Sequence, residues 1–296
     1  MENCGPSIKL IVAPEHDGKL IREYLKANDI SDRALRKLRN KGIILCNGEA
    51  ATWRRIVKTG DDIVLVYPKV EKSIYIKPEA LELDILYEDS DIVIVNKSPG
   101  VCVHPTLAHP SGTLANGMVY HWTRLNDSSS FHLINRLDQH TSGLVLIAKN
   151  SFSAQQLFLQ RQRKIISRTY NALVHGILPK SSGTINLPID KCNGRTTRRE
   201  ISVTGQEAVT HYRVVKKLKE TTLLSIVLET GRTHQIRIHM ANLGHPLVGD
   251  AMYGGTTDII ERQCLHANYI YFLHPRTGKS MSFIIPLAMD IQGLVD

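Results

Sequence analysis

The stretch HLINRLDQHTSGLVLIAKN, residues 132–150, joins a polar turn to a strongly apolar segment. The run GLVLIA has the length and composition of a buried strand, and the Thr141, Ser142 and Gly143 triplet around its start favours a tight bend. Asp138 therefore lies at a loop tip beside a rigid strand, where catalytic groups are often carried. The residues alone leave two interpretations open, because an aspartate at this place can also simply cap the turn.

The overall charge favours a polyanionic partner. The chain has 296 residues, of which 42% are hydrophobic and 22% charged, as in an ordinary globular protein. Its 37 Lys and Arg exceed its 28 Asp and Glu, which gives a formal net charge of +9. Neutralising phosphates with such a surface releases counterions, although simple solubility also accounts for an excess of this size.

Cysteine usage and hydropathy exclude several classes of protein. The five cysteines are scattered and never spaced C-x-x-C, which argues against a disulfide scaffold or a zinc ribbon and suits a reducing compartment. The first ten residues lack the pattern of a secretory signal, and no apolar run approaches the roughly 18 residues of a membrane span. We expect a cytoplasmic protein that makes no membrane contact and acts as a monomer.

Residues 1–66 are expected to form a small unit of their own. Amphipathic helices are predicted over residues 18–28 and 30–42, and a strand, an Asn-Gly turn and a second strand follow them. The second helix carries a one-signed basic stripe, made of Arg33, Arg36, Lys37 and Lys41. The unit resembles the small α/β RNA-binding (alpha-L) module named after the fourth small-subunit ribosomal protein. That resemblance implies contact with RNA phosphates, whereas an ordinary solvated helix face is the alternative.

Residues 67–80 have the two prolines and the weak periodicity of a linker, and residues 81–296 are rich in short strands. Strands are predicted at residues 91–97, 143–149, 168–176, 208–217, 222–230 and 234–240. One clear helix is predicted at residues 151–164, with Ala154, Leu157 and Phe158 facing inward. Because the order does not alternate regularly between strand and helix, we expect an α+β domain with a mixed, mainly antiparallel sheet.

The residues by themselves predict no metal site and no paired carboxylates. A strand over residues 234–240 would put His234 and His239 on opposite faces, which does not suit joint binding of a metal. The same strand would align Gln235, Arg237 and His239, so that Arg237 could pair with Asp138. A conventional glycosidase is disfavoured because the expected pair of carboxylates is missing.

Four segments, in order, carry a resemblance to a known family. The segment NRLDQHTSGLVLIAK resembles the signature of the RluA/RluD family of pseudouridine synthases. The segments RTYNALVHG, GRTHQIRIHMANLGHPLVGDAMYG and LHANYIYFLHP are similar to later motifs of that family. The likeness spans roughly residues 82–287 and, with the RNA-binding unit in front, matches the RluD-like branch. Asn135 departs from it, since the family usually has a histidine there.

The resemblance implies an enzyme that isomerises uridine in RNA to pseudouridine without a cofactor, most often in 23S-type large-subunit ribosomal RNA. It assigns Asp138 as the essential carboxylate, either a nucleophile or a base, and Arg237 as its cationic partner. It also implies that Tyr170 stacks on the target base and that Arg136 supports the flipped-out state. Arg232 is expected to contact RNA phosphates or the motif turn. Further channel candidates, for each of which plain surface charge is the alternative, are Lys97, His104, Arg161, Arg163, Lys164 and Arg168. A non-catalytic RNA-binding factor is the alternative, and transfer RNA is a second possible substrate.

Overall fold

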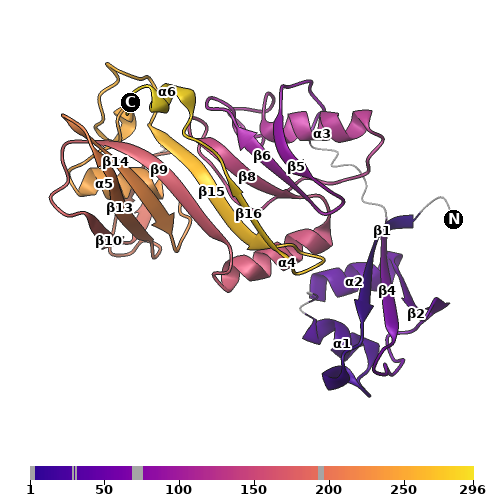
Figure 1. Cartoon of the computed structure of the whole chain (residues 1–296). Helices are drawn as coiled ribbons and strands as arrows, with labels where there is room; N and C mark the ends of the chain where they lie inside the picture. Colours follow the sequence, from indigo (N-terminus) through magenta and orange to yellow (C-terminus); the bar gives the residue numbers. More distant parts are fainter. Residues whose placement is uncertain (1–3, 29, 31, 69–75, 193–196) are drawn as a thin grey trace.

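The chain forms two units, each built on its own sheet (Figure 1). The structure is a computed structural model that describes residues 4–28, 30, 32–68, 76–192 and 197–296. The smaller unit consists of β1 (Cys4–Ile11), the short 3-10 helix η1 (Pro14–His16), α1 (Ile21–Ala27), α2 (Asp32–Lys41), β2 (Ile43–Cys46), β3 (Glu49–Ala50) and β4 (Asp62–Pro68).

The larger unit supplies the remaining elements. Its first half consists of β5 (Asp84–Glu88), β6 (Ile92–Lys97), α3 (Leu114–Arg124), β7 (His132–Leu133), β8 (Ser142–Ala148), α4 (Ser151–Gln162) and β9 (Ser167–His175). Its second half consists of β10 (Ser182–Asn186), β11 (Ile189–Lys191), β12 (Arg199–Ile201), β13 (Val209–Lys217), β14 (Thr221–Leu228), α5 (Gln235–Asn242), η2 (Ala251–Tyr253), β15 (Leu265–Leu273), β16 (Ser280–Ile284) and α6 (Met289–Gln292). No helix in the described part of the chain is long and apolar enough to cross a membrane.

The smaller unit packs α1 and α2 on a four-stranded sheet of order β1-β4-β2-β3. Both predicted helices are present, and Leu35 and Leu38 of α2 are buried as expected. The β2–β3 hairpin turns at Asn47 and Gly48, which both have positive φ, as a two-residue turn of this hand requires. Strand β1 was not predicted, and it pairs antiparallel with β4 along the edge of the sheet. Ser31, the expected cap of α2, lies outside the described residues.

The larger unit is organised by a ten-stranded sheet of order β10-β13-β14-β9-β15-β8-β6-β5. β16 pairs with β15 and β7 pairs with β8, off the main path. All of its described pairings are antiparallel except that of β15 with β8. The mixed, mainly antiparallel α+β architecture predicted from the sequence is therefore confirmed.

Strand β8 lies at the centre of the larger core, and every one of its residues is buried. Val145 and Ile147 face the cluster that α3 and α5 cover, while Leu144 and Leu146 face the cluster that α4 covers. At its start the strand runs very close to β15. A Cβ on Gly143 would lie 2.3 Å from the Ala267 carbonyl oxygen, and its φ of +112° also favours glycine. The Thr-Ser-Gly bend is thus a requirement of strand packing.

The prediction of a strand over residues 234–240 is wrong, because this segment forms helix α5. Gln235 to Met240 are all buried. The polar residues in this alternating segment therefore do not face solvent, and their side chains form hydrogen bonds inside the core. His239, for example, bonds to Thr210 and to the Leu187 carbonyl. The period of apolar residues indicates secondary structure only where one face of an element is buried and the other is exposed to solvent. It gives no such indication for a helix that is buried on both faces.

Two further details of the helices differ from the prediction. Helix α3, which buries Met118 and Trp122 against the sheet, was not anticipated. In α4 Leu157 is buried as predicted, but Phe158 is 46% exposed, and Phe152 at the start of the helix is buried instead. Phe152 packs in the core cluster of the smaller unit. Its burial therefore depends on a contact between the two units, which the apolar period of α4 alone does not predict.

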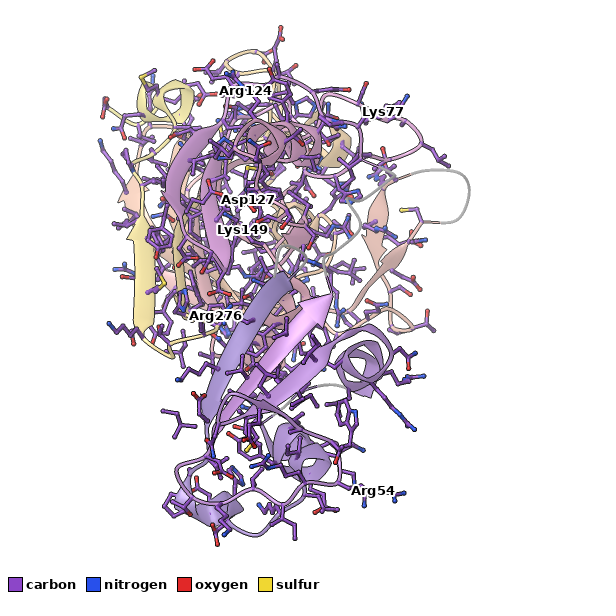
Figure 2. The ribbon with its side chains drawn as sticks, turned by 90° about the vertical axis from the view of Figure 1, so that its right-hand side faces the viewer. Arg54, Lys77, Arg124, Asp127, Lys149 and Arg276 are labelled. Atoms are coloured by element: carbon purple, nitrogen blue, oxygen red, sulfur yellow. The ribbon has the colours of Figure 1, made fainter. Side chains whose placement is uncertain are left out.

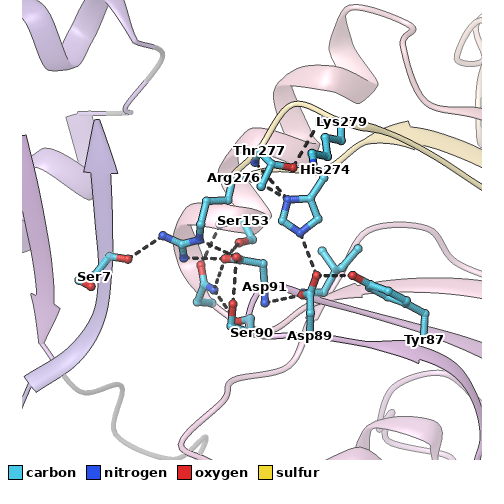
Figure 3. A network of polar contacts seen from close by, with 12 residues as sticks. Ser7, Tyr87, Asp89, Ser90, Asp91, Ser153, His274, Arg276, Thr277 and Lys279 are labelled. Atoms are coloured by element: carbon cyan, nitrogen blue, oxygen red, sulfur yellow. Dashed lines mark hydrogen bonds and ion pairs between the residues drawn. The ribbon is translucent and has the colours of Figure 1, made fainter. Parts of the chain in front are cut away.

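The two units meet at Arg276, which lies at their junction in Figure 2. Its Nε and Nη2 donate to the two carboxylate oxygens of Asp91 at 2.6 and 2.7 Å, and its Nη1 donates to the Ser7 carbonyl of β1 at 2.6 Å (Figure 3). Ser153 and Asn150 also donate to Asp91. This polar network and Phe152 together join β1 to the large sheet.

Asp91 should contribute acid-sensitive stability. Burial opposes its ionisation, but hydrogen bonds from Arg276, Ser153 and Asn150 outweigh burial and lower its pKa to about 2. A lowered pKa stabilises the fold above the unfolded-state pKa, and this term is lost as pH falls toward 2. We expect Asp91→Asn to cost about 2 kcal/mol at pH 7, in urea unfolding followed by circular dichroism, and the difference from wild type to shrink below about pH 4. A difference independent of pH would contradict this origin.

Candidate active site

A pocket of about 330 Å³ opens beside β9, between the turn that precedes β8 and the loop that leads into α5. It brings together residues that are far apart in the sequence. The candidates Arg136, Asp138, Tyr170, Arg232 and Arg237 all line it. The side chains of Arg33, Lys37 and Lys41, predicted on α2, lie outside the described residues.

Arg237 is the buried centre of the pocket. Its Nε and Nη2 donate to the two oxygens of Asp250 at 2.7 and 2.8 Å, and its Nη1 lies 3.3 Å from Asp138 Oδ2. The Asp250 side chain is 1% exposed and that of Asp138 is 26% exposed. Burial disfavours the Arg237 cation, but Asp250 and Asp138 outweigh burial and raise its pKa. The expected contact between Arg237 and Asp138 is present, but Asp250, which the sequence reading missed, is the principal partner of Arg237.

The two oxygens of Asp138 differ. Oδ2 faces Arg237 Nη1 and lies 3.8 Å from His234 Nε2. No interaction of Oδ1 is found in the described part of the chain. One oxygen is therefore held by the protein while the other remains available to a bound molecule.

The turn that carries Asp138 is tied to the strands around it. The Thr141 N–H donates to the Asp138 carbonyl at 3.1 Å and closes the turn. Asn135 donates to the Leu144 carbonyl at 3.1 Å and accepts from the Leu146 N–H at 2.7 Å, so its amide bonds to the backbone of β8. The asparagine that replaces the usual histidine thus has a definite role in positioning the turn.

Lys97 braces the same turn from behind. Its Nζ donates to the carbonyls of Ser98, Val101 and Gln139 at 2.8, 2.8 and 2.9 Å. Burial disfavours the charged form of Lys97 and lowers its pKa to about 7. The three carbonyl acceptors favour the charged form, because they match the three hydrogens of an ammonium group. Lys97 is 2% exposed, so the expectation that it lines an RNA channel is wrong.

The opening of the pocket is lined by cations. Arg136 and Arg232 are exposed, and Arg161 and Arg168 line the pocket beside them. Burial together with the charges of Arg168 and Arg232 lowers the pKa of Arg161, which indicates that these guanidinium groups lie near one another. A Cβ on Gly231 would lie 3.3 Å from Arg168, so the glycine leaves room for that side chain. The arrangement suits a polyanion threaded over the opening.

Tyr170 lies under this opening on β9. It is 4% exposed and lines the pocket together with Asp138. Most of its ring is packed in the larger core cluster, while its hydroxyl makes no hydrogen bond to the described residues and so remains open to a ligand.

Sequence reading missed two further residues at this site. His234 has φ of 59° and ψ of 17°, a left-handed conformation that is uncommon outside glycine, and it lies directly before α5. Its Nδ1 lies 2.8 Å from the Tyr253 hydroxyl. Both belong to a segment already singled out as a motif, but their contacts depend on the loop between α5 and η2.

Comparison with known proteins identifies the family of the chain. Residues 91–242, which include Asp138, Tyr170 and Arg237, match the family model described as RNA pseudouridylate synthase. The chain belongs to the RNA pseudouridine synthase family. It is 39% identical over 276 residues to the uncharacterized RNA pseudouridine synthase YjbO of Bacillus subtilis, covering 93% of this chain and 98% of that protein. The synthase is also 34% identical to ribosomal large subunit pseudouridine synthase D of Escherichia coli, over 86% of this chain and 82% of that one.

A solved structure shows the same fold. The human RNA pseudouridylate synthase domain containing 1 matches this synthase with a TM-score of 0.57 and 26% identity, covering 69% of this chain and 83% of that one. The synthase is thus an isomerase of uridine in RNA, as the resemblance implied.

Asp138→Asn and Asp250→Asn should differ in their effect on the free energy of unfolding. We expect Asp138→Asn to change the free energy of unfolding by less than about 1 kcal/mol, because Arg237 keeps both hydrogen bonds to Asp250. Asp250→Asn should cost about 3–5 kcal/mol, because it leaves a buried cation without its main counter-charge. Urea unfolding at pH 7 measures both. Equal losses of unfolding free energy would contradict the conclusion that Asp250, and not Asp138, is the main partner of Arg237.

Proposed function

We propose that this synthase isomerises specific uridines in large-subunit ribosomal RNA, with Asp138 as its essential carboxylate. The observation that carries the proposal is a carboxylate with one open oxygen, set in a pocket with Tyr170 and surrounded by arginines. The choice of RNA is supported by relatives named ribosomal large subunit pseudouridine synthase D, in Escherichia coli and in Buchnera aphidicola. We further propose that it works in the cytoplasm as a monomer, because one chain supplies the whole lining.

The reaction needs few groups. The bond between uracil N1 and ribose C1′ breaks, the base turns, and C5 bonds to C1′; the C5 proton leaves and N1 gains one. Asp138 Oδ1 either attacks ribose C1′, in a bond that breaks again when C5 bonds to C1′, or acts as the base that starts cleavage; both roles need an ionised carboxylate. Tyr170 stacks on the uracil and helps to remove the C5 proton. Atoms and electrons balance without a cofactor.

The arginines around the pocket serve the RNA. A uridine within folded RNA must first leave its stack, which costs a few kcal/mol. Arg136, exposed beside Asp138, supports the flipped-out state from the opening of the pocket. Arg161, Arg168 and Arg232 contact the flanking phosphates.

Asp138→Asn should abolish turnover while RNA affinity persists. The amide preserves size but can neither attack nor abstract a proton, so pseudouridine in a ribosomal RNA substrate, mapped by mass spectrometry, should fall below detection. The exposed Asp258→Asn is the matched control and should keep full activity. Assays in chelator should retain activity. A folded Asp138→Asn protein that still makes pseudouridine would refute the role, and an inactive wild type that binds RNA would favour a non-catalytic factor.

The smaller unit is proposed to bind RNA through the basic side of α2. A hollow of about 950 Å³ there is lined by Arg22, Leu35, Arg36, Arg39, Thr52, Trp53 and Arg54. Arg54 is exposed at the side of this unit in Figure 2. Guanidinium groups around a half-buried indole suit the phosphates and bases of an unpaired strand. Arg33, Lys37 and Lys41 belong to the same helix.

Binding at this hollow should be visible in tryptophan fluorescence. The chain has two tryptophans, and Trp122 is buried in the larger unit, so RNA should quench Trp53 alone. Trp122→Phe should keep the quenching and Trp53→Phe should remove it.

Charge reversal tests the same surface. Arg36→Glu with Arg39→Glu should lower the slope of log affinity against log salt by about 0.9 for each lost phosphate contact, if the helical-DNA value holds. Arg124→Glu on α3 is the matched reversal on an exposed site of the larger unit. If the double variant keeps the wild-type salt slope, the basic stripe of α2 is an ordinary solvated surface and not an RNA contact.

A further inference from the structure

His234 is held in an unusual conformation between two polar groups. Its left-handed φ of 59° is strained for a residue with a side chain, and His234 makes no side-chain cap bond to α5 that would offset this strain. The conformation instead leaves the imidazole, whose side chain is 10% exposed, with Nδ1 at Tyr253 and Nε2 3.8 Å from Asp138 Oδ2. Strain kept at such a place suggests that the ring orientation matters.

The hydrogen bonds around Tyr253 select one tautomer of His234. The Arg199 N–H donates to the Tyr253 hydroxyl at 2.9 Å, so that oxygen is already an acceptor. The hydroxyl hydrogen needs an acceptor of its own, and His234 Nδ1 at 2.8 Å is the only one among the described residues. With Nδ1 accepting, a neutral imidazole carries its hydrogen on Nε2, toward Asp138. The opposite tautomer would turn an Nε2 lone pair toward a carboxylate.

We propose that His234 is a positioning residue for Asp138: its Nε2–H, aimed by Tyr253, steadies Oδ2 together with Arg237 and leaves Oδ1 as the reacting oxygen. The inference rests on the proposed role of Asp138. The 3.8 Å separation exceeds a hydrogen bond, and we expect it to shorten when a uridine fills the pocket, as apo catalytic contacts often do.

A neutral donor suits this place better than a second cation. The charged groups that face the ring are Asp138, Asp250, Arg237 and Arg199. Burial lowers the pKa of His234, with Asp138 opposing, so the ring is uncharged at neutral pH. Arg237 makes two hydrogen bonds to Asp250, so it is not a counter-ion of Asp138 alone. An imidazolium at this point would add a second cation beside Asp138.

His234→Asn tests the donor while sparing the fold. Asparagine tolerates the left-handed conformation, and its amide can still reach Tyr253 but is too short to reach Asp138. We expect kcat on the ribosomal RNA substrate to fall roughly 100-fold, the order seen when a preorganised donor is removed, with KM unchanged. His239→Asn is the matched control. It removes a fully buried histidine from α5, the helix that follows His234, outside the pocket lining. It should lower the melting temperature but leave kcat per folded molecule intact.

Tyr253→Phe tests how the ring is aimed. It keeps the aromatic ring but frees the tautomer of His234, so kcat should fall less than in His234→Asn. The variant that combines Tyr253→Phe with His234→Asn should be no slower than His234→Asn alone, because both changes act through the His234 Nε2 hydrogen. Additive losses, or wild-type kcat in His234→Asn while Asp138→Asn is inactive, would overturn the inference alone. Turnover by Asp138→Asn would overturn the proposed function and the inference together.

Discussion

The buried guanidinium of Arg237 is the constraint on which the rest of the pocket depends. A cation with a side chain only 8% exposed must be matched by anions, and Asp250 supplies two charge-assisted hydrogen bonds. That pairing fixes α5 relative to the loop that follows it. The remaining nitrogen of Arg237 then reaches Asp138 at 3.3 Å. A buried ion pair of the fold thus orients the Asp138 carboxylate.

The precision of the site comes from backbone contacts behind it. The turn that carries Asp138 is held by hydrogen bonds from Asn135 to the backbone of β8 and from Lys97 to three carbonyls. The close approach of β8 and β15 at Gly143 also holds it. None of these groups needs to touch RNA. They act by holding a loop tip on a rigid strand, and a catalytic carboxylate requires such support to stay within a fraction of an ångström of its working position.

The sequence by itself determined the fold class and the place of Asp138 at a turn before a buried strand, because ordered motifs and strand periodicity are local in the chain. Tyr170, Arg136, Arg232 and Arg237 were also named from motifs, and the structure brings all four to one pocket with Asp138. Their chemical roles still rest on the family and on the experiments proposed. The basic stripe of α2 was equally visible in the sequence, but a stripe does not report whether a groove lies beside it.

Only the tertiary structure decided how these groups are paired. Residues 235–240 alternate like a strand yet form a helix, because both polar and apolar side chains are buried and no solvent-facing side marks the period. Asp250 and Tyr253 were missed because their partners, Arg237 and His234, are brought to them by the loop after α5. Lys97 resembled an RNA contact and proved to be an internal brace. Burial and partner choice are set by long-range packing, and a linear pattern does not contain them.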